Sequence, residues 1–149
     1  MKNDFVEYKW NLATSVDGKK MVGLVWDIGP ASLFYRRDVF KSAGLPSDPL
    51  EVEKQLSTWA GVLDAAKKVS IPNQRWLFPN AADIPVWVYM NRDFYDEELK
   101  LRLDKKGTLE AIEAAIEIRK NGWDAKIDMW ANETYSGLAS GKIDRKSVV

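Results

Sequence analysis

The chain has 149 residues, and its 22 basic and 22 acidic side chains give a formal net charge of zero. It contains no cysteine and no histidine, which excludes zinc sites of the usual kind, thiol nucleophiles and every catalytic triad that uses imidazole as its base. A neutral chain also lacks the basic excess that phosphate contacts require, so the composition argues against nucleic-acid partners and against a membrane-surface role.

The size and composition indicate a soluble globular protein of one ordinary domain. Apolar residues make up 46% of the chain and charged residues 30%, which is an unbiased composition. The apolar runs fall well short of the roughly 18 residues that a membrane helix needs, and the first residues lead into no apolar signal-peptide core. We therefore expect no direct membrane insertion and no signal peptide in this chain.

The first 45 residues predict strand, break, strand and short helix. Residues 9–25 are expected to be extended, ending in a buried strand at 21–25. The pair Gly29-Pro30 interrupts the pattern, and residues 31–35 form a second apolar run. Asp38 is the expected cap of the helix that follows.

The middle of the chain predicts three helices and a strand. Pro49 is well placed to open one helix, and Ser57 or Thr58 can cap the next, in which apolar residues recur every three or four positions. Residues 75–78 are expected to form a short strand. Asp83 can cap a further helix that carries Pro85 in its first turn.

The last third predicts two more helices between strands. Residues 94–103 alternate like a half-buried strand, and helices are expected at 109–120 and 131–139. Ile143 should begin another strand, but residues 144–149 are mostly polar and are expected to be a tail of unclear origin. Strands that alternate with helices predict an α/β fold, a layered sheet flanked by helices with mainly parallel strands.

Several phrases of the sequence resemble the extracellular solute-binding proteins of sugar ABC transporters, the maltose-binding-like family 1. Each phrase is short, but the combination extends from about residue 17 to residue 143. The phrases are VWDIGP at 25–30, LFYRRDVF at 33–40, AGL at 43–45, TW at 58–59, NGW at 121–123 and SGKI at 140–143.

This resemblance implies a periplasmic-binding-protein-like fold, in which two α/β lobes are joined by crossing strands and close around a ligand. A complete member is more than twice as long as this chain, so the chain resembles a fragment. Residues 1–28 would be the end of the first lobe and the crossing segment, and residues 29–143 an incomplete second lobe. Gly29 and Pro30 would form the hinge, because glycine absorbs dihedral changes and proline confines the bend.

Five residues are candidate sugar contacts: Asp27, Trp26, Asp83, Trp87 and Asn80. Indole rings stack on the C–H faces of sugars, while carboxylates and amides bond their hydroxyls. Each residue also has a structural interpretation: Trp87 as core, Asp83 as a helix cap, Asn80 as a turn residue and Asp27 as a partner of backbone N–H groups. Trp59, Trp123 and Trp130 are expected to be structural.

The expected function is therefore capture of a sugar or oligosaccharide for ABC transporter permease subunits, without a chemical step or cofactor. The parent protein would be extracellular or periplasmic, with a lipoprotein anchor as an option. The alternative is a glycoside hydrolase domain, for which Asp27 and Asp83 are the candidate pair of carboxyl groups. No metal is expected, because the acidic run at residues 96–98 lacks the spacing of a Ca²⁺ loop.

Overall fold

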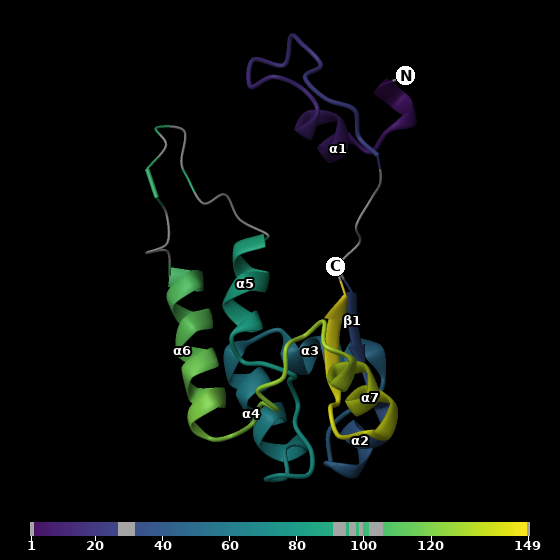
Figure 1. Ribbon diagram of the computed structural model, residues 1–149, viewed down its shortest axis with the longest axis vertical. Coiled ribbons are helices and arrows are strands. Elements are labelled where there is room, and N and C mark those ends of the chain that lie inside the picture. Colours follow the sequence, from purple (N-terminus) through teal and green to yellow (C-terminus); the bar gives the residue numbers. More distant parts are fainter. Residues whose placement is uncertain are drawn as a thin grey trace. The chain divides into compact units, whose positions relative to one another are not determined.

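The computed structural model describes residues 2–26, 32–90, 95, 98, 100, 101 and 106–148, with the side chains of 87, 89, 90, 106 and 145–148 excepted. Its contacts divide the chain into two compact units (Figure 1). One unit comprises Met1–Ser32 with Val148–Val149, and the other comprises Leu33–Ser147.

The first unit is small and differs from the strand expected there. It holds a 3₁₀ helix, η1 (Lys2–Asp4), and a short helix, α1 (Glu7–Leu12). The only pairing within its described residues is one antiparallel bridge between Thr14 and Met21. The predicted buried strand at 21–25 is wrong: Val22 and Leu24 are 69% and 77% exposed, because no neighbouring strand in the unit's described part covers them.

The second unit contains most of a two-stranded sheet, with isolated parallel bridges beside it. Strand β1 (Ser32–Tyr35) pairs with strand β2 (Arg145–Val148), and the two run in opposite directions (Figure 1). The chain just before β2 continues the sheet through a parallel bridge between Ile143 and Trp76, and Phe78 forms a second parallel bridge with Asp124. The segment 75–78 and Ile143, predicted as strands, form only isolated bridges, whereas the mostly polar residues 145–148, expected to be a tail, form a strand paired with β1.

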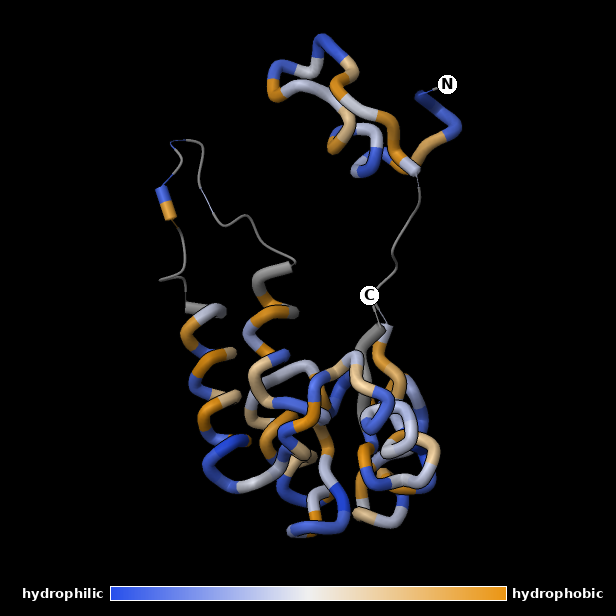
Figure 2. Tube along the Cα trace, in the orientation of Figure 1, coloured by the Kyte–Doolittle hydropathy of each residue, from blue (hydrophilic) through white to orange (hydrophobic). Residues whose placement is uncertain are grey.

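Most helices of this unit lie where the sequence predicts. Helix α4 packs against α3 and α6, and α5 packs against α6. Figure 2 shows apolar residues recurring between polar ones along α6. The helices are α2 (Arg37–Ser42), α3 (Pro49–Leu56), α4 (Trp59–Val69), α5 (Asp83–Met90), α6 (Lys106–Lys120) and α7 (Asn132–Ser140). None of the helices in the described part of the chain is long and apolar enough to cross a membrane.

The core lies among the helices and the extended segment around Leu77 and Phe78. Its fully buried members include Phe40 of α2, Val69 of α4 and Ile118 of α6, together with Leu77 and Phe78 of the central extended segment. Trp59 and Trp123 are partly buried and pack against this core, as expected. Trp130, also expected to be structural, is 56% exposed. The layered arrangement confirms the predicted α/β class.

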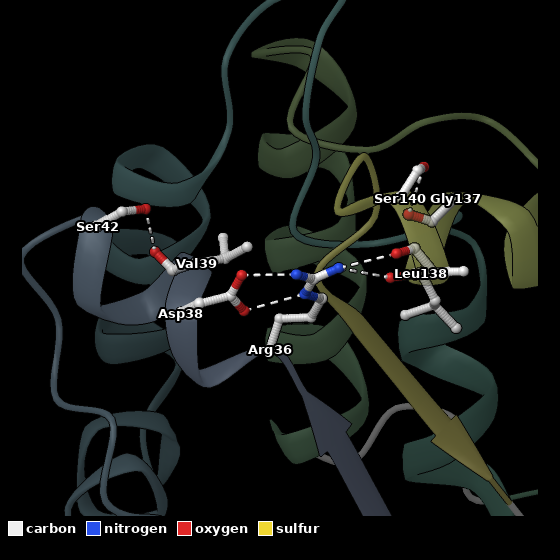
Figure 3. A network of polar contacts seen from close by, with 8 residues as sticks. Arg36, Asp38, Val39, Ser42, Gly137, Leu138 and Ser140 are labelled. Atoms are coloured by element: carbon white, nitrogen blue, oxygen red, sulfur yellow. Dashed lines mark hydrogen bonds and ion pairs between the residues drawn. The ribbon is translucent and has the colours of Figure 1, made fainter.

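The predicted cap at Thr58 is confirmed, and α3 begins at Pro49 as predicted, with Asp48 as a cap that the sequence analysis does not name. The Thr58 hydroxyl accepts the Gly61 N–H at 3.1 Å, and the Asp48 carboxylate accepts the Leu50 N–H at 3.0 Å. The predicted cap at Asp38 is wrong, because Asp38 lies inside α2 and its carboxylate binds the guanidinium of Arg36 (Figure 3).

Candidate functional site

The candidate site lies where the extended segment 76–79 ends, beside a parallel segment that begins at Asp124. The segment 76–79 and the segment that begins at Asp124 run side by side, and the Ala125 N–H donates to the Phe78 carbonyl at 3.0 Å. The chain then turns through residues 80–82 into α5. In α/β sheets, polar groups that follow parallel strands converge at this carboxyl edge, where ligands commonly bind.

Asp124 binds the backbone of the turn 80–82. Its side chain is fully buried, and its Oδ2 accepts the Ala81 N–H at 3.0 Å. Arg119 of α6 contacts the same carboxylate through two nitrogens. Its Nε donates to Oδ1 at 3.1 Å, and its Nη2 lies 2.8 Å from Oδ2. A two-point contact of this kind fixes orientation as well as position.

Asn80 joins this network from the turn itself. Its Oδ1 accepts Arg119 Nη2 at 2.6 Å and the Ala82 N–H at 3.1 Å. The Asn80 carbonyl accepts the Asp83 N–H at 3.3 Å. Asn80 thus performs the turn role that the sequence suggests, and its side-chain oxygen is already committed within the protein.

Asp83 is the first residue of α5 and carries the least satisfied carboxyl group of the site. Its Oδ2 is buried and accepts no hydrogen bond within the described residues. Burial raises the pKa of Asp83 to about 6, with further contributions from the negative charges of Asp128 and Asp124. A hydrogen bond from a ligand donor would stabilise this unsatisfied carboxyl group, because a buried acceptor without a partner costs free energy.

The roles of the other predicted contacts stay predictions. Trp26 belongs to the first unit and is 93% exposed. Asp27, Gly29 and Pro30 lie outside the described residues, as does the side chain of Trp87. The backbone of Trp87 lies on α5, four residues after Asp83, so both positions belong to one face of the helix.

Sequence reasoning missed Arg119 and Asp124. Arg119 stands in the last turn of α6, where a cation is expected on dipole grounds alone. Asp124 follows the NGW phrase and carries no local sign of burial. Only the fold, which brings positions 80 and 119 together, reveals them. Among the described residues, no cluster of three metal-ligating side chains is present.

The helix-rich α/β unit, with a polar turn where the segment 76–79 ends, has a fold similar to part of known solute-binding proteins. Over 99% of its length the chain is similar to 38% of a solved extracellular solute-binding protein of family 1, with 25% sequence identity and a TM-score of 0.75. It is also similar, over the same 99%, to 38% of the sugar-binding protein MalE from the phytopathogen Xanthomonas citri, with 16% identity and a TM-score of 0.70.

These likenesses confirm the resemblance that the sequence phrases indicate. The chain spans 38% of the length of each of these two proteins. No protein-family model matches the sequence, and no curated protein matches it. The similarity to solute-binding proteins therefore rests on the shared fold together with the sequence motifs.

Proposed function

We propose that the chain is part of a sugar-capturing receptor and comprises mainly its second lobe, residues 29–143. Residues 1–28 would then be the end of the first lobe and the segment that crosses between lobes, with the hinge at Gly29 and Pro30. The proposal is supported by the match of nearly the whole chain to only 38% of two solute-binding proteins, of which one is named as sugar-binding.

The observation that carries the proposal is the buried, unsatisfied Oδ2 of Asp83 at the carboxyl edge of the sheet. Sugar hydroxyl groups are donors that would satisfy this atom, and a hydrogen bond to a charged group contributes about 1.5–3 kcal/mol. Trp87, four residues further on the same helix, would supply an apolar ring for the sugar's C–H face. Asn80 would contribute its side-chain amide nitrogen, since its oxygen is engaged.

Trp26 and Asp27 would contact the same ligand from the crossing segment. A receptor of this kind delivers its sugar to the permease subunits of an ABC importer. It would work outside the cytoplasmic membrane, in the periplasm or at the cell surface, and a lipid anchor on the parent protein would keep it there.

The alternative function is glycoside hydrolysis, and the raised pKa of Asp83 is the observation that favours it. A glycosidase needs such a proton donor together with a second carboxyl group about 5–10 Å away across a cleft. Among the described residues, Asp124 is bound by Arg119 and Asp128 accepts the Trp130 N–H at 2.8 Å. Asp27, the partner suggested by the sequence, lies outside the described residues.

One pair of assays separates the two functions. The chain is incubated with a panel of neutral oligosaccharides, and both heat of binding and release of reducing sugar are measured. Capture predicts weak binding and complete recovery of intact sugar. Catalytic release that disappears in Asp83→Asn would overturn the binding proposal in favour of hydrolysis.

A further inference from the structure

We infer that Asp124 and Arg119 are positioning residues that hold the turn 80–82 in the conformation that presents Asp83 at the ligand face. This inference rests on the proposed function for its ligand. The contacts behind it lie within the second unit and need no ligand to be observed.

The contacts form one connected path from α6 to Asp83. Arg119 bonds both the Asp124 carboxylate and the side chain of Asn80. Asp124 Oδ2 accepts the Ala81 N–H at 3.0 Å, and Asn80 Oδ1 accepts the Ala82 N–H at 3.1 Å. Two successive N–H groups of the turn are thereby bound to side chains from the network, and the next N–H, that of Asp83, donates to the Asn80 carbonyl.

Asp124 should contribute more than Arg119 to holding the turn, because Asp124 is the more deeply buried of the two. Its side chain is fully buried, whereas that of Arg119 is 43% exposed. Water can replace the guanidinium's partners, but it cannot readily reach Ala81, whose N–H would lose its acceptor if the carboxylate were removed. Asp124 is therefore the residue whose loss should open the turn.

Amide hydrogen exchange of the chain tests this inference without sugar. In Asp124→Leu, we expect the Ala81 and Ala82 amides to exchange at least tenfold faster relative to the amide of Ile143, which donates to the Gly137 carbonyl elsewhere in the unit. In Asp124→Asn, the remaining carbonyl oxygen can still accept the Ala81 N–H, so protection of Ala81 should return. A side chain that served only global stability would instead lower the protection of all these amides by one factor, and that result would overturn the inference.

Asn80→Ala keeps the test decisive if Asp124→Leu does not fold. Asn80 is only half-buried, and its replacement removes the acceptor of the Ala82 N–H while leaving the Asp124–Ala81 bond. Faster exchange at Ala82 with protection kept at Ala81 supports separate roles, in which Asp124 binds the Ala81 N–H and Asn80 binds the Ala82 N–H. Equal loss at both amides contradicts them.

Sugar titration of the same variants is read separately. If the turn opens in Asp124→Leu while sugar still contacts Asp83 with unchanged affinity, the positioning role in binding is overturned. If the unaltered chain shows no response to any sugar, the proposed function is overturned, whatever the amides show.

Discussion

Gly137 of α7 lies directly against the side chain of Ile143, which leads into β2. A Cβ atom placed on Gly137 would stand 2.8 Å from Ile143 Cδ1 and 2.9 Å from Cγ1. Ile143 is 1% exposed and its N–H donates to the Gly137 carbonyl at 3.0 Å. The glycine therefore lets helix and strand approach closely, in spite of its poor helix propensity.

Gly137→Ala should destabilise the protein. The helix gains about 1 kcal/mol from alanine, but overpacking against a buried side chain costs about 1–3 kcal/mol. We expect a net loss of about 1 kcal/mol in urea unfolding. Ile143→Val removes Cδ1, so the double variant should lose less than the sum of the single variants by roughly 0.5 kcal/mol or more. Strict additivity, or stabilisation by Gly137→Ala alone, would contradict the close contact.

Arg36 ties the end of β1 to the end of α7. Its Nη1 donates to the carbonyls of Leu138 and Ala139 at 3.2 and 3.0 Å, and its other nitrogens bind Asp38 (Figure 3). The bond to Arg36 lowers the pKa of Asp38. A cation at a helix C-terminus satisfies carbonyls that the helix itself leaves open.

Replacing Arg36 should therefore cost more stability than replacing Asp38. Arg36→Met removes the helix-end contacts together with the ion pair, whereas Asp38→Asn removes only an exposed ion pair of small value. Thermal unfolding of the two variants at low and high salt checks the order, and the Asp38→Asn loss should shrink with salt. Equal losses would show that the carbonyl contacts contribute nothing.

Asp83 should make the protein less stable as the pH rises from about 4 to about 6. Its pKa is raised from 3.8 to about 6 in the folded chain, so in this range the folded state binds more protons than the unfolded state and loses stability as they dissociate. Discounted for partial exposure of the group, the effect is on the order of 1 kcal/mol. Asp83→Asn should abolish this part of the pH dependence.

The measurement is urea unfolding at pH 4.5 and 7.5. Asp38→Asn is the matched control, because the lowered pKa of Asp38 keeps that group ionised across the whole range. An unchanged pH dependence in Asp83→Asn would show that the carboxyl group is solvated in the folded chain.

Local chemistry made much of the second unit predictable. Thr58, Pro49 and the spacing of apolar residues in α4 each specify a helix without help from distant residues, and the predicted bounds 131–139 agree closely with α7. The strands that depend on partners were harder. Residues 145–148 are polar, and their pairing with β1 follows from the fold rather than from their own sequence.

In the first unit, a predicted strand does not form. Residues 21–25 have the apolar content of a buried strand, but among the described residues of this unit they find only the bridge at Met21. Of the residues at the candidate site, Asn80 and Asp83 are predicted sugar contacts, and that role stays a prediction. Arg119 and Asp124 were not predicted, because their roles depend on contacts that only the fold creates. Arg119 of α6 bonds the side chain of Asn80, which lies 39 residues earlier in the chain.

The most direct test of the central claim is a protein-observed NMR titration of this chain with neutral mono- and oligosaccharides. Because the proposed function gives this chain only part of the contacts of a two-lobed receptor, we expect affinity no tighter than the millimolar range, equivalent to about −4 kcal/mol. The shifts should include the amides of residues 80–88 and the Trp87 indole, together with the proposed contacts Trp26 and Asp27, and Asp83→Asn should weaken them. Micromolar binding by the chain alone, shifts centred on another face, or no response to any sugar would contradict the account.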